Sequence, residues 1–206
     1  MINSVFIVDD HPFICSGIKA YLRANGYTIA GIAQDGVSVI ADVGLHRPDL
    51  VIMDLNIPGR DGMQVIESLK RVNAQQKIIV LTASESEFHM QRCLLLGVDG
   101  YLCKNHDITQ LLQAIRSIEK GIKFYPCSHN TEVKSLHPES EKLMTLSRRE
   151  LMVLRKLAAG YSNKEIALQL SLSNKTISTY KIKILRKLGI KSVVDINEVA
   201  KRNYLV

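Results

Sequence analysis

Five polar side chains each stand just after a short apolar run, at the position where a buried strand would end: Asp9, Asp10, Asp54, Thr82 and Lys104. Carboxylates brought close together repel one another unless a cation joins them, and hydrated, oxygen-loving Mg²⁺ is the ion that best suits such a group. A carboxylate can also accept a phosphoryl group as an aspartyl-phosphate, while an ammonium neutralises the transferring oxygens. The set predicts phosphoryl-transfer chemistry at a magnesium site.

The elements that would bring these side chains together alternate in type up to about residue 125. Runs rich in Val, Ile and Leu predict strands at 5–8, 28–33, 50–53, 78–81 and 100–102. Amphipathic segments predict helices at 12–24, 37–45, 63–72, 88–96 and 108–120. Strands with little polar alternation are typical of a parallel sheet covered on both faces. Five βα units predict an α/β fold with a doubly wound, five-stranded parallel sheet in the flavodoxin-like order 2-1-3-4-5, whose ligands bind at the carboxyl ends of the strands.

Charge divides the chain unevenly. Residues 1–125 carry 12 Lys and Arg against 13 Asp and Glu, whereas residues 126–206 carry 15 against 7. The net charge of +7 therefore comes from the last two fifths of the chain, which indicates a basic domain that meets a polyanion, although a solvated basic face would show the same excess. We predict a first domain at 1–125, a polar, proline-containing linker at 126–143 and a second domain at 144–206.

The second domain is predicted to be all helical. Ser147, Ser162 and Ser192 each precede an acid by three residues, and Ser173 is a fourth candidate N-cap. The helices predicted after them span 148–159, 163–170, 174–188 and 193–202. A three-residue turn joins the second to the third, which is basic and has no acid. The pair predicts a helix-turn-helix whose second helix enters DNA, although a generic helical hairpin shares the pattern.

Four motifs surround the predicted site: VDDHP at 8–12, MDLNIPG at 53–59, LTA at 81–83 and GYLCK at 100–104. Together they resemble the receiver domain of bacterial two-component response regulators, and the resemblance covers residues 1 to about 122. It implies that Asp54 is the phosphoacceptor and that Lys104 binds the phosphoryl group. It also implies a set of Mg²⁺ ligands, namely Asp9, Asp10, Asp54 and the backbone carbonyl of Asn56. Thr82 would be the switch hydroxyl and Tyr101 the switch aromatic, while Asn105 replaces a proline that many receivers have.

A second set of motifs lies in the basic domain: LSRRE at 146–150, AAGYSNKEIA at 158–167, SNKTI at 173–177 and KLG at 187–189. These resemble the four-helix DNA-binding domain of the NarL/FixJ (LuxR-type) family, and residues 174–181 resemble its BvgA/EvgA branch. The implied DNA contacts are Asn174, Lys175, Thr176, Ser178, Thr179, Lys181, Lys183 and Lys187. Ser178 and Thr179 would face bases, whereas the lysines would contact phosphates. Ile182 replaces a lysine of some members, so their base specificity does not transfer.

The two resemblances together imply a cytoplasmic transcription regulator that is not an enzyme. The expected partners are a sensor histidine kinase or phosphotransfer domain, double-stranded DNA, RNA polymerase and, on DNA, a second copy of the chain. A membrane is not an expected partner, because no apolar stretch approaches the roughly 20 residues of a span. The four cysteines lack metal-site spacing and are predicted to be free thiols: Cys15, Cys93, Cys103 and Cys127.

Two other classes of protein share parts of this pattern. An aspartate-nucleophile phosphatase also combines an α/β sheet, acids and Mg²⁺, but it usually places a second acid two residues after the nucleophile, where this chain has Asn56. A DNA-binding protein with a degenerate receiver would act without phosphorylation, and the intact Asp54 and Lys104 argue against it. Labelling with a small phosphodonor and Mg²⁺ separates the three classes.

Overall fold

A computed structural model describes residues 1–83, 86–125 and 138–206. The chain divides into two compact units: the first comprises residues 1–85 and 90–130, and the second comprises residues 86–89 and 131–206. Residues 126–137 of the predicted linker, with Cys127, lie outside the described residues. Each unit is described by itself.

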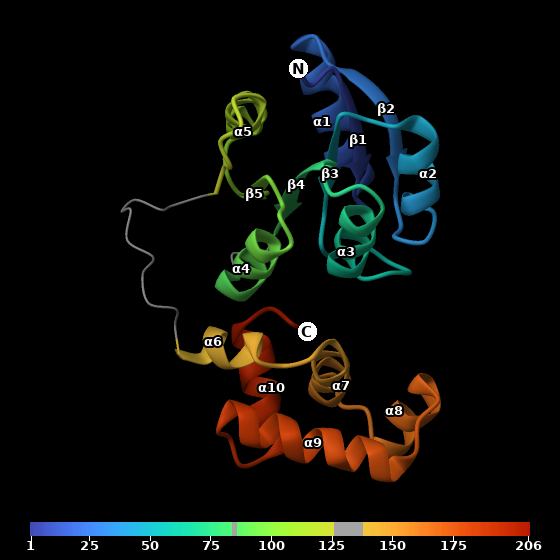
Figure 1. The fold of residues 1–206 in the computed structure, drawn as a ribbon, viewed down its shortest axis with the longest axis vertical. Helices are drawn as coiled ribbons and strands as arrows, with labels where there is room; N and C mark the ends of the chain where they lie inside the picture. Colours follow the sequence, from blue (N-terminus) through green and yellow to red (C-terminus); the bar gives the residue numbers. More distant parts are fainter. Residues whose placement is uncertain (84–85, 126–137) are drawn as a thin grey trace. The chain divides into compact units, whose positions relative to one another are not determined.

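The first unit contains an all-parallel sheet of five strands: β1 Ser4–Val8, β2 Thr28–Ala33, β3 Leu50–Met53, β4 Lys77–Thr82 and β5 Gly100–Cys103. The strand order is β2-β1-β3-β4-β5 (Figure 1), as predicted. β1 pairs with β3 so that Val8 lies opposite Met53. Because the next residue along each strand is an aspartate, Asp9 and Asp54 leave the sheet at the same edge.

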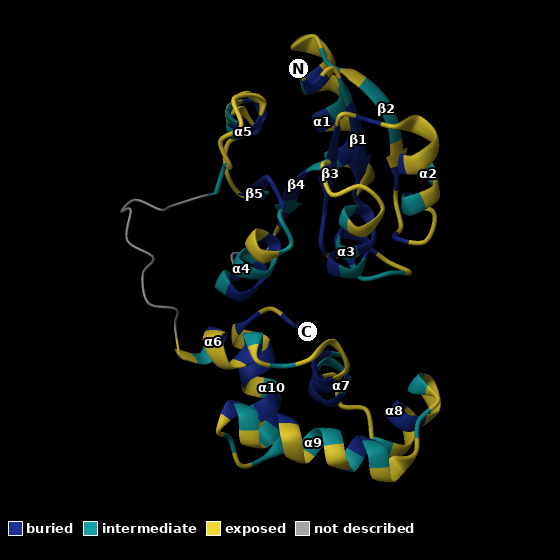
Figure 2. Cartoon of the chain, viewed as in Figure 1, coloured by how far each residue is buried: buried dark blue, intermediate teal, exposed yellow. Residues whose placement is uncertain are grey.

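Five helices belong to this part of the chain: α1 Pro12–Ala24, α2 Val39–His46, α3 Gly62–Val72, α4 Glu87–Leu95 and α5 Thr109–Glu119. Successive strand residues face opposite sides of a sheet. Accordingly, Val5 of β1 shares a buried cluster with α1 and α5, whereas Phe6 shares one with α2 and α3. The sheet is thus covered on both faces, and its central strands are coloured as buried in Figure 2.

Strand β2 differs from the prediction that every strand is covered on both faces. Its residues are mostly half-buried, and Ile32 is 39% exposed. β2 lies at the edge of the sheet and pairs only with β1. The position of a strand within the sheet is a tertiary property, so an apolar run alone did not distinguish this edge strand from a central one.

The second unit is helical, as predicted, and contains α6 Pro138–Met144, α7 Arg148–Ala158, α8 Asn163–Leu170, α9 Asn174–Leu188 and α10 Val193–Arg202. The predicted N-caps are confirmed. Ser147, Ser162 and Ser192 form complete capping boxes, and the Ser173 hydroxyl accepts a hydrogen bond from the backbone N–H of Thr176. These bonds satisfy N–H groups that the first helical turn leaves without partners.

Within the predicted linker, residues 138–143 are helical and belong to α6. Leu143 is buried in the core of the second unit. Glu139 accepts hydrogen bonds from the Arg202 guanidinium at 2.7 Å and from Asn203 Nδ2 at 2.7 Å. Leu143 and Glu139 thus hold this otherwise polar helix against the rest of the second unit. Two contacting residues are too few to show a helical periodicity in the sequence.

Two predictions about single features concern cysteines and membranes. Cys15, Cys93 and Cys103 are buried free thiols, and burial raises the pKa of Cys93 to about 12. A buried thiol with so high a pKa stays protonated and unreactive. Within the parts of the chain that the structure describes, no helix is long and apolar enough to cross a membrane.

Candidate functional site

The predicted carboxylates gather at the carboxyl edge of the sheet. Asp9 and Asp54 are buried, whereas Asp10 is half-buried. One side-chain ligand atom from each of these three residues and from His11 lies within 4.8 Å of all the others. Strand register explains the arrangement of Asp9 and Asp54, because β1 and β3 are hydrogen-bonded neighbours that end at the same level.

Lys104 joins two of these carboxylates. Its Nζ lies 2.7 Å from Asp9 Oδ2 and 2.7 Å from Asp54 Oδ2. Burial lowers the pKa of Lys104, but the hydrogen bonds to Asp54 and Asp9 outweigh it, and the pKa is raised overall. A permanently charged ammonium therefore stands against the predicted phosphoacceptor, where it can neutralise incoming phosphoryl oxygens.

The same cluster contains His11, which the sequence-based prediction did not include. Its Nδ1 lies 2.8 Å from Asp10 Oδ1 and 3.1 Å from Asp9 Oδ1. Its backbone N–H donates to Asp9 Oδ1 at 2.9 Å. The available signal was its position directly after the acid pair, but adjacency in sequence does not show whether a ring turns back toward preceding side chains.

The donor set fits a hard divalent cation. The opposite ligands of an octahedral Mg²⁺ lie about 4.2 Å apart, given Mg–O bonds of about 2.1 Å, which is compatible with a cluster whose atoms lie within 4.8 Å of one another. Asp10 Oδ1 is buried without a well-oriented hydrogen bond, although His11 Nδ1 is 2.8 Å away. Asn56 is exposed, and its backbone N–H donates to Asp54 Oδ1 at 3.2 Å.

The two predicted switch residues lie on neighbouring strands. Thr82 ends β4, is fully buried, and its backbone carbonyl accepts a hydrogen bond from the Lys104 N–H at 2.8 Å. Tyr101 of β5 pairs with Val80 of β4 and is only 2% exposed. Its ring lies in the core on the side of α2 and α3. Thr82 is therefore beside the acid cluster, and Tyr101 is one strand away with its ring inward.

A glycine that the motifs did not single out sets the position of the Asp54 loop. Gly62 begins α3, and a Cβ built on it would lie 2.7 Å from the Asp54 carbonyl oxygen and 2.7 Å from Leu55 Cα. Only the absence of a side chain permits so close an approach between helix and loop. The glycine was visible in the sequence, but its neighbour was not.

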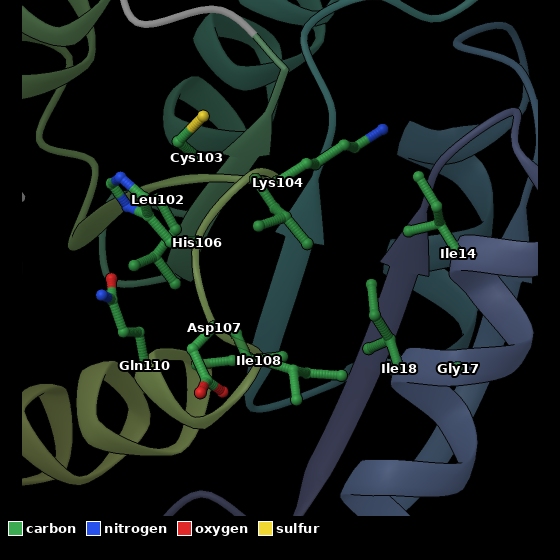
Figure 3. Close-up of a pocket in the computed structure, with 12 residues that line it drawn as sticks. Ile14, Gly17, Ile18, Leu102, Cys103, Lys104, His106, Asp107, Ile108 and Gln110 are labelled. Carbon is green, nitrogen blue, oxygen red and sulfur yellow. The ribbon is translucent and has the colours of Figure 1, made fainter.

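Beside the acid cluster, α1 and the segment that leads into α5 enclose a pocket of about 200 Å³ (Figure 3). Its lining is mainly aliphatic and includes Ile14, Ile18 and Ile108. The Lys104 side chain extends away from His106 and Gln110, as Figure 3 shows, which agrees with its ion pairs to Asp9 and Asp54. The pocket is therefore an apolar neighbour of the site.

In the second unit, α8 and α9 form the predicted helix-turn-helix. Ser171 follows the end of α8, and its left-handed backbone (φ 54°, ψ 45°) turns the chain before Ser173 caps α9. The apolar side of α9 is buried through Ile177, Ile184 and Leu188. Its outer side presents side chains at helical spacing: Lys175, Thr179, Ile182, Lys183 and Arg186. Asn174 is also exposed, whereas Thr176 and Lys181 are half-buried.

The two predicted base-facing residues differ in their surroundings. Ser178 is half-buried; its hydroxyl donates to the Asn174 carbonyl at 3.1 Å and accepts from Asn163 Nδ2 of α8 at 3.2 Å. Thr179 is exposed, and its hydroxyl donates to the Lys175 carbonyl at 3.0 Å. Ser178 thus helps to join the two helices of the motif, whereas Thr179 remains on the outer side.

Lys187, one of the predicted DNA contacts, also makes contacts within the second unit. Its Nζ contacts Glu150 Oε2 at 2.6 Å and donates to the Thr145 carbonyl at 3.0 Å. Burial raises the pKa of Glu150, but the hydrogen bonds from Lys187 and Ser147 outweigh it and lower the pKa below its ordinary value of 4.5. Lys187 therefore ties α9 to the start of α7, and its contact with DNA stays a prediction.

Both units match known families of regulators. Residues 5–116 match the response regulator receiver domain, and residues 144–200 match the bacterial regulatory proteins of the luxR family. The chain therefore belongs to the two-component response regulators, and its output domain is a luxR-type DNA-binding domain that serves transcription regulation.

Its relatives include two regulators that match over nearly their whole length. The virulence-factor transcription regulator BvgA of Bordetella pertussis is 34% identical over 208 residues, which cover 100% of both chains. The DNA-binding transcriptional activator EvgA of Escherichia coli K12 is 34% identical over 200 residues, which cover 97% of this chain and 98% of that one. A structure of two RcsB dimers bound to two parallel DNAs matches with a TM-score of 0.61 at 30% identity, covering 98% of each chain.

Proposed function

We propose that Asp54 accepts a phosphoryl group from a phosphohistidine of a sensor kinase or phosphotransfer domain, and that phosphorylation promotes dimerisation and DNA binding. The observation that carries the proposal is the Lys104 ammonium, which lies 2.7 Å from Asp54 Oδ2 and 2.7 Å from Asp9 Oδ2 within one buried acid cluster. A structural ion pair would need only one carboxylate, whereas phosphoryl transfer needs a nucleophile, a cation and an acid pair together.

In this reaction a carboxylate oxygen of Asp54 attacks phosphorus, and the bond from phosphorus to the donor's imidazole nitrogen breaks. The Asn56 N–H orients Asp54 through Oδ1. The Lys104 ammonium would move from the Asp54 carboxylate to the arriving phosphoryl oxygens, and its positive charge would remain paired with a negative one. Asp9, Asp10, Asp54 and the Asn56 carbonyl would hold Mg²⁺, which supplies further positive charge to those oxygens when bound.

The phosphoryl group would then act on Thr82 and Tyr101. A phosphoryl adds about −1.5 to −2 charge, and the hydroxyl of Thr82 lies on the strand next to Lys104. Movement of Thr82 toward that charge would alter the packing around the Tyr101 ring and the surface of β4 and β5. We propose this change as the route from phosphorylation to assembly of a homodimer.

The proposed partners follow from the two surfaces. The apolar pocket adjoins the acid cluster, because Lys104 belongs to both, and the strongly exposed Phe13 of α1 follows Asp9 and Asp10 closely in sequence. These apolar features would bind a phosphodonor protein. The outer side of α9 suits the major groove of double-stranded DNA. By likeness to RcsB, which binds DNA as dimers, we propose that a cytoplasmic homodimer binds paired half-sites and engages RNA polymerase there.

The test is the Asp54→Asn variant of the full chain, treated with acetyl phosphate and Mg²⁺. Wild type should gain one phosphoryl group that hydroxylamine removes, together with tighter DNA binding, and Asp54→Asn should gain neither. Asp107→Asn is the matched control, because Asp107 is an exposed aspartate close to Lys104 in sequence and outside the acid cluster. Labelling of Asp54→Asn at the wild-type level would refute the proposal, and rapid continuous release of phosphate would instead indicate a phosphatase.

A further inference from the structure

We propose that His11 is an imidazole ligand of the divalent-cation site, so that this receiver binds nitrogen-accepting ions such as Co²⁺ and Ni²⁺ more tightly, relative to Mg²⁺, than oxygen ligands alone would allow. The inference rests on the proposed function, because the ion concerned is the one that the acid cluster would hold. It adds a nitrogen donor to a site for which the family resemblance implies only oxygens.

The backbone presets the approach of the His11 ring. His11 is the N-cap of α1, yet its side chain makes no capping hydrogen bond. Pro12 follows it, and a residue before proline is restricted to extended backbone, as the φ of −92° and ψ of 106° show. The His11 N–H is itself held by Asp9 Oδ1 at 2.9 Å. The ring therefore begins from a fixed backbone that faces the acids.

The spacing of the donor atoms is that of neighbouring ligands on one ion. Adjacent ligands of an octahedral ion with bonds of about 2.1 Å lie about 3.0 Å apart. His11 Nδ1 lies 2.8 Å from Asp10 Oδ1 and 3.1 Å from Asp9 Oδ1. An ion bound to both carboxylates would thus have Nδ1 within reach, and little rearrangement of the three side chains is needed.

The protons balance without a further reactant. The His11 ring binds as the neutral tautomer, with its lone pair on Nδ1 and its proton on Nε2. A proton displaced from Nδ1 by the ion passes to solvent, with which Nε2 also exchanges protons. The His11 side chain is 60% exposed, so solvent reaches the ring.

Ion choice follows from ligand type. Carboxylates and water satisfy Mg²⁺, whereas imidazole favours later first-row ions, whose affinities rise from Mn²⁺ toward Cu²⁺. His11 should consequently contribute much more to the binding of Co²⁺ than to that of Mg²⁺. If the imidazole only neutralised the acids, it would compete with both ions or leave them unaffected. Its removal would then strengthen the binding of both ions or leave it unchanged.

The experiment titrates the full chain with Co²⁺ alone and with Mg²⁺ alone by calorimetry. His11→Ala should weaken Co²⁺ binding by about tenfold or more, the size usual for ligand-shell changes, while Mg²⁺ affinity changes by less than about threefold. His106→Ala removes an exposed imidazole outside the cluster and should change neither affinity. In the Co²⁺ form, proton NMR should show strongly shifted imidazole ring C–H signals that His11→Ala abolishes.

Two results would overturn the inference while leaving the proposed function intact: an unchanged ratio of Co²⁺ to Mg²⁺ affinity in His11→Ala, or no shifted imidazole C–H signal in the wild type. Asp10→Asn distinguishes a deeper failure. If neither ion binds the wild type, or if Asp10→Asn leaves the binding of both ions unchanged, the acid cluster is not the metal site, and the metal part of the proposed function fails together with this inference.

Discussion

The closest backbone contact at the site provides a quantitative test of how the fold positions Asp54. In Gly62→Ala, the new Cβ would lie 2.7 Å from the Asp54 carbonyl oxygen and 2.8 Å from the Leu55 carbonyl oxygen, whereas ordinary contacts begin at 3.4 Å. These atoms belong to the backbone, so no rotamer change relieves the clash. The loop and the start of α3 must separate by several tenths of an ångström.

Two effects of Gly62→Ala should follow. Overpacking of this kind costs about 1–3 kcal/mol of unfolding free energy. A displacement of about 1 Å at a reacting group lowers rates about 100-fold, so a somewhat smaller shift of Asp54 should slow phosphorylation by about 10- to 100-fold. The rate would be measured with acetyl phosphate and Mg²⁺, and the stability by urea unfolding of the same samples.

Gly44→Ala is the matched control, because Gly44 lies on α2, is exposed, and has nothing within 4 Å of an added Cβ. It should stabilise the protein by about 0.5–1 kcal/mol and leave the phosphorylation rate unchanged. If Gly62→Ala phosphorylates at the wild-type rate, the contact does not set the position of Asp54. Lost stability with an unchanged rate would mean that α3 moves and the Asp54 loop does not.

Three further predictions concern the second unit. Lys183→Ala should weaken specific and random DNA binding alike and reduce the salt slope by about one. Lys187→Ala should cost about 1–2 kcal/mol of unfolding free energy, because it leaves the buried Glu150 carboxylate without its cation. Urea unfolding would measure that loss. Because the pKa of Glu150 is lowered, its contribution to stability is complete above about pH 4.5 and is lost as the pH falls through the lower folded-state value. Glu150→Gln should therefore lose less stability than wild type between pH 7 and a pH below 4.5, as unfolding at the two pH values would show. Thr179→Ala should cost roughly 1–3 kcal/mol of binding free energy on the true operator and little on random DNA. Ser178→Ala should also destabilise the fold. An unchanged base preference of the double variant across a randomised operator library would contradict base reading by this pair.

Local sequence was sufficient for most of the first unit. Apolar runs of strand length, separated by amphipathic segments, predicted the helices and strands to within about two residues. Helix starts were equally readable, because an N-cap serine and an acid three residues later interact within a single turn, as at Ser162 and Glu165. The acid cluster was also predictable, since strand ends in a parallel sheet lie at a common edge.

Features that depend on partners distant in the sequence were not readable in this way. Lys183 and Lys187 are both cations on one basic helix, but Lys187 meets Glu150, which lies 37 positions earlier. Gly62 and His11 were visible as residue types, but their roles were not. The role of Gly62 depends on the Asp54 backbone, which would lie 2.7 Å from an added Cβ. The role of His11 depends on its ring turning back toward the carboxylate of Asp10. Periodicity and capping report interactions within a few residues, whereas these contacts exist only once the chain has folded.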